Sequence, residues 1–138
     1  MDCIFCKIVA GEIPAAIIAE SDTALAFLDV MPLTDGHVLV IPREHAATVE
    51  ELSEASAAGV FALASRLAGP VRKALGADGT TIGINNGAST GQTVPHVHVH
   101  IVPRYAGDGA GSIHTIFGNH AGETAPLEQV AERIRAEI

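Results

Sequence analysis

The stretch HVHVHIV at residues 96–102 places a histidine at every second position, with β-branched residues after each one. Successive side chains of a strand point to opposite faces, so His96, His98 and His100 are expected to share one face while the residues between them face the core. Alternate strand residues stand about 7 Å apart, so all three imidazoles would reach one metal ion only under strain. Three interpretations remain: a solvated face, a metal cluster, or imidazoles used for proton and nucleophile chemistry.

The composition indicates an acidic domain with a mainly aliphatic core. The 138 residues contain 8 Lys and Arg against 16 Asp and Glu, a net charge of −8. This charge repels a phosphate backbone, so we expect no nucleic-acid partner. There is no secretory leader and no apolar run approaching the ~18 residues of a membrane span, which predicts a cytoplasmic protein without membrane attachment. No repeat or linker divides the sequence, so one domain over residues 1–138 is expected.

The hydrophobic patterns predict an α+β domain. Short strands are expected at residues 17–20, 24–30, 37–42, 80–85 and 96–102, a long amphipathic helix at 49–75, and a closing amphipathic helix at 127–134. Gly69 and Pro70 are expected to bend or break the long helix, because proline lacks the helical N–H. Strands grouped around one helix, without repeated βαβ units, favour a mainly antiparallel five-stranded sheet.

Two further motifs are ambiguous by themselves. The glycine-rich stretch NNGASTGQTVP at residues 85–95 can aim backbone N–H groups at an oxyanion, but it lacks a phosphate-loop lysine and is equally well explained as a structural turn. Cys3 and Cys6 form a CxxC pair, which is compatible with zinc binding, redox chemistry or inert packing. No second such pair exists, so a closed zinc site would need two histidines.

Two segments, GHVLVIPREH at 36–45 and GQTVPHVHVHIVPR at 91–104, resemble the histidine triad (HIT) family of nucleotide hydrolases and transferases. Residues 96–102 fill its motif of alternating histidine and apolar positions, and the similarity extends from Asp2 to about Asp108, which implies a HIT-like fold. By this resemblance His98 is the nucleophile that attacks the α-phosphorus and becomes a nucleotidyl-histidine, while His100 contacts the phosphate and leaving group. Neutral imidazole suits this role, because a backbone carbonyl on one nitrogen leaves the other lone pair exposed at neutral pH.

The resemblance also implies roles for other residues. His37 lies behind the triad and completes its hydrogen bonding, unless it is simply a core histidine. The phosphate would be bound near Asn85, Gly91, Gln92 and Thr93, the ribose by Asp29, and the purine by Ile4, Phe5, Ile8, Phe27 and Val30, of which Phe5, Ile8 and Phe27 would otherwise be assigned to the core. As in some bacterial members, structural zinc would be held by Cys3, Cys6, His45 and His96. His114 and His120 belong to no motif and are expected in loops.

Several functions remain open at this point. The segment CIFCKI and the chain length favour the Hint-like branch, which acts on purine nucleoside phosphoramidates, whereas Gln92, Thr93 and the segment PRYAGDG resemble the fragile-histidine-triad branch, which splits dinucleoside polyphosphates. A zinc hydrolase with a metal-bound water and a non-catalytic nucleotide-binding module are alternatives from other classes. The family also implies a homodimer joined through the long helix and the TTIGIN strand.

Overall fold

The computed structural model describes residues 2–118 and 123–138, which group into two compact units, one ending at Asp108 and the other starting at Gly109. Each unit is described by itself below. One domain over residues 1–138 stays a prediction.

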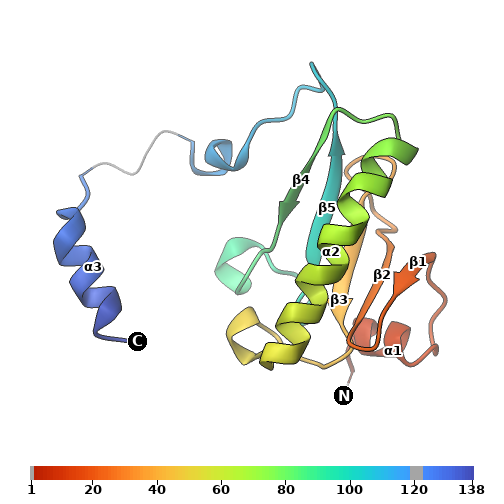
Figure 1. The fold of residues 1–138 in the computed structure, drawn as a ribbon, viewed down its shortest axis with the longest axis horizontal. Helices are drawn as coiled ribbons and strands as arrows, with labels where there is room; N and C mark the ends of the chain where they lie inside the picture. Colours follow the sequence, from red (N-terminus) through yellow and green to blue (C-terminus); the bar gives the residue numbers. More distant parts are fainter. Residues whose placement is uncertain (1, 119–122) are drawn as a thin grey trace. The chain divides into compact units, whose positions relative to one another are not determined.

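The first unit contains a five-stranded antiparallel sheet (Figure 1). Its strands are Ile17–Glu20 (β1), Ala24–Leu28 (β2), Val38–Pro42 (β3), Gly79–Gly83 (β4) and Val99–Arg104 (β5), in the spatial order β1-β2-β3-β5-β4. The predicted α+β class and five-stranded antiparallel sheet are confirmed. Strand β2 ends at Leu28, two residues before its predicted end at residue 30. Strand β5 begins at Val99, three residues after its predicted start at residue 96.

The predicted long helix is divided into a 3-10 turn, Val49–Glu51 (η1), and an α-helix, Glu54–Ala74 (α2). Ser53 caps the start of α2, since its side chain accepts a hydrogen bond from the Ser56 N–H at 3.2 Å. Pro70 lies inside α2 and does not break it. The carbonyl that loses its helical donor belongs to Arg66, on an exposed turn where water can replace the missing N–H.

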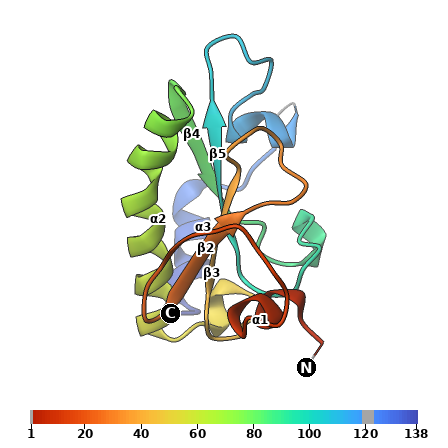
Figure 2. The same cartoon turned by 90° about the vertical axis from the view of Figure 1, so that its right-hand side faces the viewer.

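Helix α2 covers one face of the sheet (Figure 2). The core between them consists of Ala24, Ala26, Val38, Val40, Val60, Leu63, Ala64, Val71, Val99 and Ile101. On α2 the buried residues of this core are Val60, Leu63, Ala64 and Val71, whereas Phe61 is 50% exposed. Phe61 follows Val60 directly, so it points about 100° away from the buried stripe.

A short helix that the sequence did not predict, Ile4–Val9 (α1), packs on the opposite face. This second core consists of Cys3, Phe5, Ile8, Leu25, Phe27, Leu39 and Ile41. Alternate residues of β2 and β3 thus point to α2 and to α1, and both faces of the central strands are buried. His100 is paired with Leu39 across the sheet, which places it on the α1 face.

The second unit contains a 3-10 turn, Ile113–Phe117 (η3), and the predicted C-terminal helix, Leu127–Arg135 (α3). His114 lies in η3 rather than in an irregular loop, and His120 lies outside the described residues. None of the helices in residues 2–118 and 123–138 has the length and apolar character required to cross a bilayer.

Candidate active site and metal centre

The triad histidines do not all lie in the strand. His96 and His98 precede β5, because the His96 N–H bonds to the Val94 carbonyl at 2.8 Å and the Val97 N–H bonds to the Ala46 carbonyl at 2.8 Å. The rings of His98 and His100 still pack together, with centroids 5.0 Å apart. His96 turns away from them into a separate cluster. The prediction that all three lie on one strand face is therefore wrong, because of the three only His100 belongs to β5.

His98 is held with a defined proton arrangement. Its Nδ1 lies 2.8 Å from the main-chain oxygen of His96, and a carbonyl only accepts, so Nδ1 carries the hydrogen. The lone pair of a neutral His98 is then on Nε2. The Phe5 ring meets the His98 ring edge-on at 5.2 Å and fixes its tilt, and the side chain is only 7% exposed. This arrangement presents an oriented nucleophilic nitrogen without an acidic partner.

His100 is hydrogen-bonded to His37, which directly precedes β3. The Leu33 N–H donates to His37 Nδ1 at 3.1 Å, and His37 Nε2 lies 2.8 Å from His100 Nδ1. Among the described residues, His100 Nε2 is the buried side-chain polar atom left without a hydrogen-bond partner. Burial, followed by the neighbouring His98 and His37, lowers the pKa of His100 from 6.5 to about 4, so the ring is neutral at neutral pH.

Asp29, the predicted ribose ligand, lies at the end of β2 beside this pair. Its Oδ2 is 3.7 Å from His37 Nε2, and its Oδ1 accepts a hydrogen bond from the Met31 N–H. Burial lowers the pKa of His37 despite the opposing effect of the Asp29 carboxylate. The predicted His37 role behind the triad is thus compatible with its 2% exposure.

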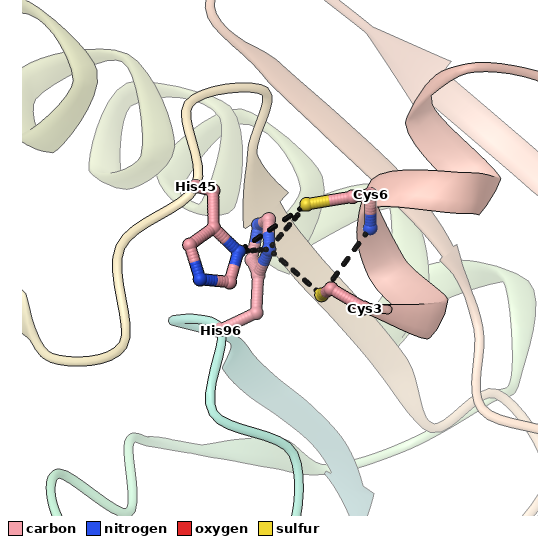
Figure 3. Close-up of side chains that lie close together, drawn as sticks. All are labelled: Cys3, Cys6, His45 and His96. Carbon is pink, nitrogen blue, oxygen red and sulfur yellow. Dashed lines mark hydrogen bonds between the residues drawn. The ribbon is translucent and has the colours of Figure 1, made fainter. Parts of the chain in front are cut away.

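The four predicted metal ligands converge in one cluster (Figure 3). Ligand atoms at 2.0–2.3 Å from a tetrahedral ion are about 3.3–3.8 Å apart. His96 Nδ1 lies 3.5 Å from Cys3 Sγ, 3.6 Å from Cys6 Sγ and 3.2 Å from His45 Nδ1, and Cys6 Sγ lies 3.2 Å from His45 Nδ1. The two distances from His96 Nδ1 to the sulfur atoms fall within this range, and the two distances to His45 Nδ1 lie just below it.

The protonation of His96 also fits a metal ligand. Its Nε2 lies 2.9 Å from the Pro42 carbonyl, so Nε2 carries the hydrogen and Nδ1 turns a lone pair toward the thiols. Burial lowers the pKa of His96 and keeps it neutral. Burial, reinforced by Cys3, raises the pKa of Cys6, an effect that a bound cation would reverse.

Asp29, His37 and His100 form a second group with ligand atoms close together. The 2.8 Å between His37 Nε2 and His100 Nδ1 is shorter than a metal tetrahedron edge and typical of a hydrogen bond. We therefore assign this group as a hydrogen-bonded pair beside a carboxylate.

The glycine-rich loop is held by Gln92. Its Nε2 donates to the carbonyls of Ala47 at 2.7 Å and Val94 at 3.0 Å, and its Oε1 accepts from the Gly87 N–H at 2.8 Å. Gly87 and Gly91 adopt φ angles of 106° and 95°, which favour glycine. The predicted phosphate role of the Gln92 side chain would require breaking these bonds.

The predicted phosphate ligand Asn85 is exposed, and its neighbour Asn86, which the sequence analysis missed, anchors the loop. The Asn86 side chain accepts from the Val49 N–H at 2.9 Å and donates to Glu50 at 2.9 Å. Thr93 is exposed and lines a pocket with His45 and Ile4. This pocket lies beside the Cys and His cluster.

The residues predicted to form the purine pocket differ in burial. Phe5, Ile8 and Phe27 are 7%, 8% and 4% exposed and belong to the core under α1. This agrees with the alternative assignment of these three residues to the core. Ile4 and Val30 are 49% and 90% exposed. Of the five predicted purine contacts, only these two are exposed and can contact a ligand from solvent.

Comparison with known proteins identifies the family. The HIT domain profile matches residues 10–107. Adenosine 5′-monophosphoramidase hnt1 of Schizosaccharomyces pombe is 48% identical over 104 residues, 75% of either chain. A HIT family protein from Bacillus subtilis superposes over 100% of this chain and 98% of its own, with a TM-score of 0.88 and 38% identity. A Zn-bound histidine triad family protein from Mycobacterium smegmatis superposes over 99% of this chain and 92% of its own, with a TM-score of 0.74 and 38% identity. Together with the paired His98 and His100 rings, these matches show that the chain belongs to the HIT family.

Proposed function

We propose that this protein is a nucleotide hydrolase or transferase that acts on the α-phosphate of purine nucleoside phosphoramidates through a nucleotidyl-histidine at His98. The observation that carries the proposal is the hydrogen bond from His98 Nδ1 to the His96 carbonyl, because it leaves the Nε2 lone pair free. The 48% identity to a protein named adenosine 5′-monophosphoramidase supports the substrate class.

In the first half-reaction, His98 Nε2 bonds to the α-phosphorus and the bond to the leaving group breaks. The ring becomes positively charged, and its Nδ1–H bond to the His96 carbonyl strengthens as a charge-assisted bond. In the second half-reaction, water attacks the phosphorus, the Nε2–P bond breaks, and nucleoside monophosphate leaves.

The remaining family roles are part of the same proposal. His100 Nε2 is a buried donor without a partner, and a phosphate oxygen would satisfy it. Asp29 would bind the ribose hydroxyls, and the exposed Ile4 and Val30 would contact the purine. Asn85, Gly91 and Thr93 would contact the phosphate, whereas the Gln92 side chain supports it through the loop.

We further propose zinc as a structural ion bound by Cys3, Cys6, His45 and His96. The tetrahedral separations support this, as does the Zn-bound relative. Zinc would supply a crosslink between α1 and the segment that carries His98. It would not contact the bond that is broken.

The central test compares wild type with His98→Ala on adenosine phosphoramidate and diadenosine polyphosphates, with His114→Ala as an exposed control. His98→Ala should lower turnover by at least about 10³-fold, and the control should match wild type. Acid-quenched wild type should carry AMP on His98, detected by mass spectrometry. Turnover that persists in His98→Ala would contradict the proposal.

Other outcomes would favour the alternatives. Preference for the polyphosphates would indicate the fragile-histidine-triad activity. Turnover that vanishes with chelation, returns with zinc and survives His98→Ala would indicate a zinc hydrolase. Nucleotide binding without turnover or covalent AMP would indicate a binding module.

A homodimer completes the proposal. Strand β4 lies at the edge of the sheet, and Ile82 on β4 and Phe61 on α2 are 45% and 50% exposed. Pairing of two such surfaces through a two-fold axis would cover them. Sedimentation as a single 14 kDa species would contradict this.

A further inference from the structure

The hydrogen bonds around His37 determine the position of every ring proton in the pair. A backbone amide can only donate, so the Leu33 N–H requires the lone pair of His37 on Nδ1. A neutral imidazole has one N–H, which must then be on His37 Nε2 and directed at His100 Nδ1, 2.8 Å away. His100 Nδ1 therefore accepts, and the single proton of His100 is on Nε2.

We propose that the loop between β2 and β3, residues 29–37, locks this tautomer, so that His100 acts as a neutral Nε2–H donor to a phosphate oxygen and does not protonate the leaving group. His37 is then a positioning residue that acts through His100. The inference rests on the proposed nucleotidyl transfer and specifies the role of one of its groups.

If His100 acted as a general acid, the His37–His100 pair would have to carry one additional proton. The hydrogen-bond geometry opposes that proton on either Nδ1 atom. A proton on His37 Nδ1 would face the Leu33 N–H, and a proton on His100 Nδ1 would face the His37 Nε2–H. Either one replaces a hydrogen bond by a donor-donor contact in a buried place. The network is therefore complete only when both rings are neutral.

The charged groups around the pair do not reverse this conclusion. Asp29, at the end of β2, faces His37 Nε2 at 3.7 Å and favours protonation, while His98 and burial oppose it. Asp29 is itself held by the same loop, because its N–H donates to the His37 carbonyl at 2.9 Å. The pKa of His100, lowered to about 4, indicates that burial and the neighbouring rings prevail.

The proton balance of the reaction closes without a proton from His100. As the P–N bond breaks, the leaving nitrogen takes its proton from solvent, and His98 keeps its own proton on Nδ1. When water later attacks the phosphorus, the water loses a proton to solvent and His98 returns to the neutral state. His100 contributes a fixed dipole at a phosphate oxygen, as neutral histidines do in other enzymes that stabilise oxyanions.

The tautomer itself can be observed by ¹⁵N NMR of the histidine-labelled protein. Wild-type His100 is expected as the pure Nε2–H tautomer down to about pH 5. His37→Gln should preserve it, because a Gln amide accepts the Leu33 N–H and donates to His100. His37→Leu should release a mixture of tautomers. A wild-type His100 that is protonated near neutrality, or that carries its proton on Nδ1, would overturn the lock, and the wild-type spectrum decides this even if a variant does not fold.

A kinetic comparison tests the consequence. The substrates are AMP p-nitrophenyl ester, with a good leaving group, and an AMP alkylamidate, whose amine needs a proton. His100→Ala should slow both by about the same factor, on the order of 10²-fold. An additional loss of about 100-fold or more confined to the alkylamidate would identify His100 as the acid and refute the inference. If wild type cleaves neither substrate, the proposed function fails, while the NMR result still decides the lock.

Discussion

Acid should destabilise this protein through His100, and the effect can be worked out from its environment. Burial lowers the pKa of His100 from 6.5 to about 4. A histidine with a lowered pKa in the folded state contributes its full stability above about pH 6.5. That stability is lost as the pH falls toward about 4, because the unfolded chain takes up the proton first.

The size of the effect follows from the two pKa values. At about pH 5 an unfolded histidine is almost fully protonated, whereas His100 in the folded protein is almost fully neutral. The difference corresponds to about 2 kcal/mol of unfolding free energy between about pH 7.5 and pH 5. Burial also lowers the pKa values of His37 and His96, which act in the same direction.

Urea denaturation followed by far-UV circular dichroism at the two pH values measures this loss. His100→Gln cannot titrate, so its loss of stability on acidification should be about 2 kcal/mol smaller than that of wild type. His114→Gln, at an exposed histidine, serves as the matched control and should lose as much as wild type. Contributions from bound metal and from the histidines that do not contact His100 cancel in this comparison. If His100→Gln and wild type lose the same free energy, the claim that His100 is held neutral is wrong.

Three further predictions concern the proposed zinc site, α2 and the glycine-rich loop. Cys6→Ser should lower the zinc bound per chain, measured by plasma mass spectrometry, and lower the thermal midpoint; unchanged zinc content would contradict the assigned site. Gly59→Ala should destabilise the protein by about 1–3 kcal/mol in urea denaturation, because the added methyl overlaps the Thr23 hydroxyl. Gly79→Ala in β4 meets no atom within 4 Å beyond its chain neighbours and should stabilise the protein by up to about 1 kcal/mol; equal effects would refute the packing argument. Gln92→Ala removes three side-chain hydrogen bonds and should speed limited proteolysis at residues 87–94, whereas unchanged cleavage would show that the loop holds without them.

The sheet and the long helix could be predicted because their periodicity is set by residues close in sequence. Helix α1 could not, because six residues are too few for a clear helical period. A weak signal existed in the i, i+3 spacing of Cys3 with Cys6 and of Phe5 with Ile8. The prediction for Pro70 was wrong where it expected a break, since the Arg66 carbonyl that loses its helical donor lies on an exposed turn where water can bond to it.

The site shows a similar division between local and distant causes. The alternating sequence pattern correctly predicted that His98 and His100 lie side by side, because the separation of residues i and i+2 depends on local backbone geometry. The turn of His96 depends on the Val97 N–H meeting the Ala46 carbonyl, which belongs to a different part of the chain. The hydrogen bond from Gln92 to the Ala47 carbonyl likewise connects two residues that are far apart in the sequence, so no local pattern predicts it.

His96 links the Cys and His cluster to His98, the proposed nucleophile, through two different groups. Its Nδ1 lies in the Cys and His cluster, while its main-chain oxygen orients His98. Substitution of His96 leaves that carbonyl in the chain but frees its position, so it perturbs both functions together. Loss of the Cys6 ligand acts on His98 indirectly, through α1, where Phe5 contacts both imidazoles, and through the side chain of His96. A Cys6→Ser protein that loses zinc and keeps the His98 tautomer would therefore show that the backbone, and not the metal, holds the nucleophile in position.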